Sequence, residues 1–306
     1  MDGALLHSKN ESAMQTKTTN KVTVIGLGMM GSTLAQLLLD SGHAVTIWNR
    51  SSNKAAALIE QGAVLAASPQ EAVAASPLVI ICVMGYAATM NILDTPAVAA
   101  ALAGKTVIQL SSTSPNEAQQ TADWAIAQRA IYLDGAIQAA PSQMGRPDTP
   151  IFFSGDQQAF EKYNDTLRVF GGGLTYLGPK ASQASAVDLA TLSYIYGSVL
   201  GFFHGAHIME AAGLSVDDYS TLVAGITPSF GDFLQHEGKM IHRNDFSISE
   251  SPLSISIEAV GRILQQAREA GINDSFPQYA NNMMQQGAAA GYAGEELAAL
   301  IKVLRQ

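Results

Sequence analysis

Six residues near the N-terminus have the types and spacing to bind a phosphate group through their backbone. The segment Gly26–Gly31 reads GLGMMG and directly follows the β-branched run Val22–Ile25. In dinucleotide-binding folds the first glycine permits a tight turn, the second lets the backbone approach a pyrophosphate, and the third allows close helix–sheet packing. A helix over Met30–Ser41 would direct its free N–H groups at the phosphates. A Gly-rich turn of some other α/β fold is the alternative. The flanking strand and helix favour a dinucleotide site formed by Gly26, Leu27, Gly28, Met29 and Met30.

The loop after the next expected strand, Ala44–Trp48, indicates which nicotinamide cofactor binds. NAD sites usually carry Asp or Glu at this point, for the ribose 2′-hydroxyl. The segment Asn49–Lys54 instead reads NRSSNK, without a carboxylate. Arginine offers a planar fork that suits a phosphate, and lysine offers a point charge. We therefore predict a 2′-phosphate pocket and the cofactor NADPH, with contacts from Asn49, Arg50, Ser51 and Lys54. An exposed loop that is basic by chance is the alternative.

Asp188 is the only acidic or basic residue between Ala181 and Phe203. This stretch is long enough to consider a membrane span. Polar Ser, Thr and Gln residues dilute it, so we expect a buried helix that joins two domains. Burial of an isolated carboxylate favours its protonated form, which suits a proton donor near neutral pH. Tyr196 lies about 80° around the helix from Asp188, two turns further on, and can line the same cavity. An acid that caps a helix end or pairs with a distant lysine explains Asp188 equally well.

The elements that must position these residues change character along the chain. Short β-branched runs alternate with Ala-rich helical segments up to about residue 178, which predicts a Rossmann domain with a parallel-rich sheet. Ser68-Pro69 and Ser114-Pro115 are typical of helix starts. After Gly178 the chain reads as helices. We expect an α/β protein with a flexible extension at residues 1–20, a cofactor domain at 21–178, and an interdomain helix plus an all-helical domain at 179–306. Breaks are predicted near Gly213, Thr227-Pro228, Ser251-Pro252 and Gly271.

The composition excludes several classes of protein. The 306 residues are 47% apolar and 14% charged, with a net charge of −9 and no Lys/Arg run. We expect no nucleic-acid or membrane partner and a cytoplasmic location. The single cysteine, Cys82, excludes a disulfide framework. His204, His207 and Glu210 follow one another at three-residue steps but lack the helical zinc spacing, so we predict no metal.

These motifs, in this order, resemble the β-hydroxyacid dehydrogenase superfamily and, within it, the imine reductases and reductive aminases. The resemblance covers the chain from Lys21 and includes the segment Tyr132–Ile137, YLDGAI. Hydroxyacid dehydrogenases place a catalytic lysine where this chain has Asp188, and bind the substrate carboxylate with a Ser-Gly-Gly turn where this chain has Gln138-Ala139-Ala140. An acid in place of a cation repels carboxylates and attracts a cationic iminium ion.

The resemblance implies an NADPH-dependent imine reductase that transfers hydride to the C=N carbon of a small imine. Asp188 would anchor or protonate the imine, or hold the product amine, and Tyr196 matches a second site tyrosine. Further cofactor contacts are expected from Val83, Met84, Ser111 and Ser112. Ser112 stands where reductive aminases carry Asn, which weakens the case for imine formation from ketone and amine.

The resemblance also implies an intertwined homodimer in which each helical domain contacts the other chain's Rossmann domain. Apolar residues of the helical domain, including Ser229–Phe233 and Met240, would then line the substrate pocket, although core packing explains them as well. Two other functions stay open at this stage. One is an NADP-dependent dehydrogenase of a hydroxyacid or carbonyl compound, and the other is a non-catalytic NADPH-binding protein.

Overall fold

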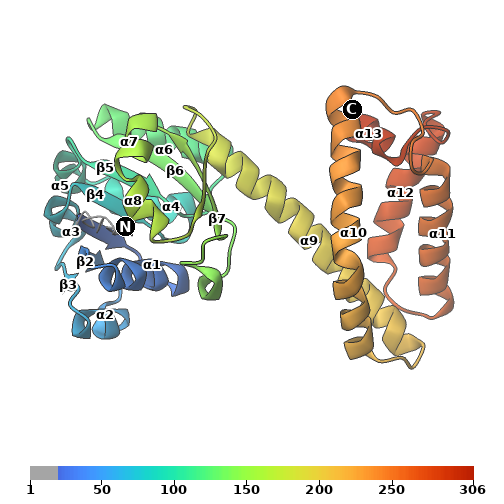
Figure 1. Cartoon of the computed structure of the whole chain (residues 1–306), viewed down its shortest axis with the longest axis horizontal. Helices are drawn as coiled ribbons and strands as arrows, with labels where there is room; N and C mark the ends of the chain where they lie inside the picture. The colour runs from blue at the N-terminus through green and yellow to red at the C-terminus, as the bar shows by residue number, and fades with distance from the viewer. Residues whose placement is uncertain (1–19) are drawn as a thin grey trace, which may run out of the picture. The chain divides into compact units, whose positions relative to one another are not determined.

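The computed structural model describes residues 20–306, so the predicted extension lies outside the described residues except for Asn20. The chain forms two compact units. The division falls between Leu192 and Ser193, inside a long helix. Figure 1 labels most of the helices and strands.

One eight-stranded sheet is the base of the first unit (Figure 1). Its strands run in the order β3-β2-β1-β4-β5-β6-β7-β8. All neighbouring strands are parallel except the pair β6 and β7, which is antiparallel. Because the order reverses between β1 and β4, a topological switch point lies at their carboxyl ends. The bounds are β1 (Lys21–Ile25), β2 (Ala44–Trp48), β3 (Val64–Leu65), β4 (Leu78–Ile81), β5 (Thr106–Gln109), β6 (Ile131–Ile137), β7 (Pro150–Gly155) and β8 (Gly173–Tyr176).

Helices cover both faces of this sheet because its central strands are apolar on both sides. In β4, Leu78 and Ile80 join one buried cluster, which also contains Leu34 of α1. Val79 and Ile81 join a second cluster on the other face. Fully buried parallel strands of this kind read as continuous apolar runs. The helices are α1 (Met29–Asp40), α2 (Ala56–Glu60), α3 (Pro69–Ala75), α4 (Gly85–Leu93), α5 (Pro96–Ala101), α6 (Pro115–Ala127), α7 (Gln157–Lys162) and α8 (Asn164–Arg168), with 3-10 turns η1 (Ser52–Lys54) and η2 (Pro141–Gln143).

The two predicted helix starts are confirmed. The Ser68 side chain accepts a hydrogen bond from the backbone N–H of Glu71 at the start of α3. Ser114 and Glu117 form a reciprocal capping box at the start of α6. In both helices proline occupies the first turn, where a missing N–H costs nothing.

The second unit is helical, as predicted. It comprises the end of α9 (Ser182–Ala211), then α10 (Val216–Arg243), α11 (Leu253–Glu269), α12 (Ser275–Ala289), η3 (Leu297–Leu300) and α13 (Ile301–Leu304). The predicted break at Thr227-Pro228 is wrong, because α10 continues through Pro228. Proline removes one backbone hydrogen bond from a helix interior. Pro228 and Ala224, whose carbonyl loses its partner, are both exposed, so water can solvate that carbonyl.

The prediction of a buried helix over Ala181–Phe203 is also wrong for the single chain. Only Ala184, Ser185 and Asp188 of α9 are buried. Its later turns expose large apolar side chains, among them Tyr194, Ile195, Leu200 and Phe203. Among the described residues, α9 is the one helix that length and composition would allow to cross a membrane, which is weak support for such a role.

Candidate active site and cofactor site

The glycine turn between β1 and α1 has the tight geometry that the motif predicts. Gly26 has a φ of +100°, and a Cβ there would lie 2.2 Å from the carbonyl oxygen of Cys82. A Cβ on Gly31 would lie 2.0 Å from the carbonyl oxygen of Gly26. Both positions therefore require glycine for the fold itself.

Gly28 differs from the other two glycines because its surroundings are open. No atom lies within 4 Å of a Cβ built on Gly28, and its φ of −69° suits any residue. Gly28 is the N-cap of α1, and no side chain caps this helix. Met29, the first residue of α1, is 82% exposed. The open space and the uncapped N–H groups fit a dinucleotide pyrophosphate at this point.

The loop after β2 is attached to the glycine turn by Asn49. Its Oδ1 accepts a hydrogen bond of 3.0 Å from the backbone N–H of Leu27, and its Nδ2 donates to the carbonyl of Ser51. Arg50 and Lys54 are exposed and form none of the ion pairs in the described part of the chain. Two cations free to bind a phosphate are what a 2′-phosphate pocket requires.

Four more predicted cofactor residues lie where β4 and β5 end. The Ser111 hydroxyl accepts a hydrogen bond of 2.9 Å from the backbone N–H of Val83. Val83 also adjoins Gly26, since a Cβ on Gly26 would lie 2.7 Å from its Cγ1. Met84 is 94% exposed, and Ser112 is exposed beside it in the β5–α6 loop. The structure thus brings both strand ends to the switch point beside the glycine turn.

Asp188 is held against the carboxyl end of β6. Its side chain is only 5% exposed, and its Oδ1 accepts a hydrogen bond of 2.7 Å from Nε2 of Gln138. Gln138 comes directly after β6, and its backbone N–H donates to the carbonyl of Pro150. The carboxylate therefore has a polar partner from the Rossmann sheet, which the sequence did not reveal.

A buried polar network lies beside Asp188. Asp134 accepts hydrogen bonds from the Ser185 hydroxyl at 2.7 Å and from the Tyr132 hydroxyl at 3.1 Å. The hydroxyls of Ser185 and Thr113 are 3.1 Å apart. Burial and, to a smaller extent, the charge of Asp188 raise the pKa of Asp134 to about 7, although the hydrogen bonds from Ser185 and Tyr132 oppose this shift. Asp134 is thus a second titratable group near Asp188.

Sequence reasoning missed Asp134 and Gln138 as site residues, although their spacing carries a signal. Residues 134, 136 and 138 point to one side of a strand, because side chains alternate. Ser185 and Asp188 are three residues apart and share a face of α9. Recognising these two faces as neighbours needs the tertiary structure.

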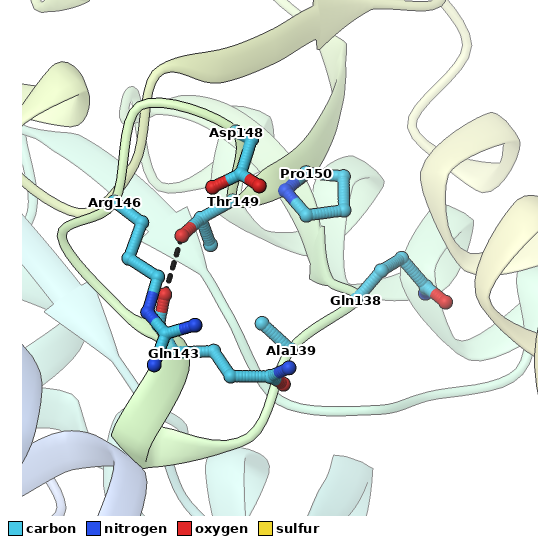
Figure 2. A pocket seen from close by; sticks show the side chains of 7 residues that line it. All are labelled: Gln138, Ala139, Gln143, Arg146, Asp148, Thr149 and Pro150. Carbon is cyan, nitrogen blue, oxygen red and sulfur yellow. Dashed lines mark hydrogen bonds between the residues drawn. The ribbon is translucent and has the colours of Figure 1, made fainter. Parts of the chain in front are cut away.

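A shallow pocket adjoins the end of β6, and Gln138 is one of the residues that line it. Figure 2 shows the Arg146 and Gln143 side chains close together in it, whereas the Gln138 side chain extends away from them. The Arg146 guanidinium donates to the carbonyl of Ser142, and the Thr149 hydroxyl donates to the carbonyl of Gln143. Both hydrogen bonds lie within the loop that connects Gln138 to β7.

Two residues predicted for the substrate pocket lie in the second unit. Tyr196 is on α9, eight residues after Asp188, and is 64% exposed. Met240 is 6% exposed and packs with Phe246 and Ala299 in a core cluster. Met240 is therefore a core residue of the second unit. Core packing was the alternative explanation for this apolar residue.

A glycine turn at the switch point of a Rossmann-like sheet, beside an unpaired basic loop, defines the class of nicotinamide-dependent oxidoreductases. Residues 21–178 match the NAD binding domain of 6-phosphogluconate dehydrogenase, and residues 181–306 match the NADPH-dependent reductive aminase-like C-terminal domain.

Individual relatives are similar over nearly the whole chain. An NADPH-dependent reductive aminase from Aspergillus oryzae is 30% identical over 93% of this chain and 97% of its own. The structure of an imine reductase from Myxococcus stipitatus in complex with NADP⁺ aligns with a TM-score of 0.89 at 28% identity, over 93% of this chain and 99% of that one. A reductive aminase from Aspergillus terreus, in complex with NADPH4, cyclohexanone and allyl amine, aligns with a TM-score of 0.86 at 32% identity, over 94% and 100%. The chain belongs to the family of imine reductases and reductive aminases, and the predicted resemblance and fold class are confirmed.

Proposed function

We propose that this protein is an NADPH-dependent imine reductase that converts small, preferably cyclic, imines into amines. The observation that carries the proposal is Asp188, a carboxylate held by Gln138 at the carboxyl end of β6. The family and its NADPH-dependent members support both the reaction and the cofactor.

The bound cofactor would supply the hydride that adds to the C=N carbon, and the imine nitrogen must gain a proton. The glycine turn would hold the pyrophosphate, and Arg50 and Lys54 would hold the 2′-phosphate. Asp188 would attract the iminium cation to the end of β6. Burial raises the pKa of Asp134 to about 7, and the charge of the nearby Asp188 contributes to this shift, so Asp134 can exchange a proton near neutral pH.

The direct test compares NADPH with NADH in the reduction of 2-methyl-1-pyrroline, with a no-imine control. We expect imine-dependent oxidation that is much faster with NADPH. A parallel screen of β-hydroxyacids with NADP⁺ tests the dehydrogenase alternative. Turnover of a hydroxyacid without any imine turnover would reject the proposal, and tight NADPH binding without turnover of any substrate would favour the non-catalytic alternative.

The protein is further proposed to act in the cytoplasm as an intertwined homodimer, with a cofactor domain at residues 21–178 and a substrate and dimerisation region at 179–306. The exposed apolar side chains of α9 and α10, including Leu200, Phe203, Ile226 and Phe230, support a second copy as the covering partner. Soluble monomers rarely expose large contiguous apolar patches. Sedimentation analysis should give twice the mass of one chain, and a monomer at micromolar concentration would contradict the proposal.

Tyr196 completes the proposed site as a residue that contacts substrate. Its exposure in the single chain leaves its hydroxyl available to a ligand or to the second copy. Ser112, in the loop after β5, offers a small hydroxyl. We expect the protein to reduce preformed imines faster than it aminates ketones, and a comparison of the two reactions at equal amine concentration tests this.

A further inference from the structure

The amide of Gln138 is oriented by the carboxylate that it contacts. Nε2 of Gln138 lies 2.7 Å from Oδ1 of Asp188. An ionised carboxylate only accepts hydrogen bonds, so the –NH₂ end of the amide must face it. The amide oxygen, Oε1, therefore faces away from Oδ1.

Two oxygen atoms of this pair are left with free acceptor capacity. Within the described residues, Oε1 of Gln138 and Oδ2 of Asp188 accept no hydrogen bond. Neither oxygen is fully buried, so both can accept a hydrogen bond from a ligand or from water. Each is bonded to the carbon that carries one of the two contacting atoms, so the two oxygens belong to directly neighbouring groups.

Two hydrogen bonds hold this pair in place from either side. The N–H of Gln138 donates to the carbonyl of Pro150 at 3.1 Å, at the point where β6 and β7 separate. One turn before Asp188, Ser185 donates to Asp134 on β6. A group fixed in this way discriminates between ligands, because it cannot turn to accommodate a poor fit.

We propose that Gln138 and Asp188 form a two-acceptor site for a nitrogen cation that carries two N–H groups. Such cations are secondary ammonium products and primary iminium ions. Their N-alkylated counterparts carry one N–H and would leave one acceptor facing a carbon atom, which costs the hydrogen bond and the hydration of that oxygen. The identity of the ligand rests on the proposed function, whereas the two-acceptor geometry does not.

The test measures binding rather than turnover. The protein with bound NADP⁺ is titrated by calorimetry with 2-methylpyrrolidine, whose cation has two N–H groups, and with 1,2-dimethylpyrrolidine, whose cation has one. We expect the first to bind about tenfold to hundredfold more tightly, the value of one hydrogen bond to a charged group. In Gln138→Met the ratio should fall, because the acceptor Oε1 of Gln138 is lost.

A control variant separates this role from a general effect of substitution. Gln120 is exposed on α6, and its side chain forms no hydrogen bond with the residues that the structure describes. Gln120→Met should keep the binding ratio of the unmodified protein, and both variants should keep its thermal midpoint within a few degrees.

Three results would overturn the inference: an unmodified protein that does not distinguish the two amines, a Gln138→Met variant that weakens both equally, or one that weakens neither. A ratio that depends on Gln138, in a protein that reduces no imine, would support the two-acceptor site and reject the proposed function. The same ratio together with imine turnover would support both.

Discussion

The two glycines that bracket Leu27 should respond in opposite ways to the same added methyl group. Gly26→Ala forces an alanine to a φ of +100° and places its Cβ 2.2 Å from a backbone oxygen. Backbone strain of this kind costs about 1–3 kcal/mol, and overpacking costs about 1–3 kcal/mol more. Gly28→Ala meets no atom within 4 Å and keeps an allowed φ, so it loses only N-cap preference, about 1 kcal/mol or less.

The free energy of unfolding should therefore fall by roughly 2–6 kcal/mol in Gly26→Ala and by about 1 kcal/mol or less in Gly28→Ala. NADPH affinity should fall in Gly28→Ala despite its near-normal stability, because the methyl group occupies the space of the pyrophosphate. Chemical denaturation measures the first quantity, and NADPH fluorescence titration measures the second. Equal destabilisation by both substitutions, or unchanged NADPH affinity in Gly28→Ala, would refute this reasoning.

Two further predictions concern charge. Arg50→Ala and Lys54→Ala should each reduce the preference for NADPH over NADH by about tenfold or more, the value of a charged hydrogen bond. The ratio of the kcat/KM values for the two cofactors measures this preference. An unchanged ratio would place the 2′-phosphate elsewhere. Asp134→Asn should change the pH dependence of stability. Because the folded-state pKa of Asp134 is raised from 3.8 to about 7, its contribution is fully present below pH 4 and is lost as the pH rises through 7. Urea unfolding across this range should show that decline in the unmodified protein and a smaller one in the variant.

Much of the first unit could be predicted from local sequence. The run LVII of β4 and the alternation of such runs with helices follow from β-branched composition, and Ser68 and Ser114 act as caps in the predicted places. The start of α1 was predicted to within one residue. These features depend on contacts between residues close in the chain, so the sequence contains them directly.

The active site was harder to predict because its partners are far apart in the chain. Gln138 and Asp188 are 50 residues apart, and Ser185 and Asp134 are 51 apart. A lone acid on an apolar helix indicated that a polar partner must exist but not which residue provides it. The effect of Pro228 could not be predicted for a related reason. Its effect on a helix depends on whether water reaches the freed carbonyl, which is a property of the folded surface.

The substitution Asp188→Asn tests the central claim most directly. Asparagine keeps the shape of the side chain and an oxygen that can accept from Gln138, but it removes the negative charge. The claim predicts that kcat/KM for 2-methyl-1-pyrroline falls by about a hundredfold or more, with the dissociation constant of NADPH unchanged. Asp123→Asn, on the exposed surface of α6, should leave both quantities unchanged. Full imine turnover in Asp188→Asn would contradict the account, because the carboxylate would then have no part in the reaction.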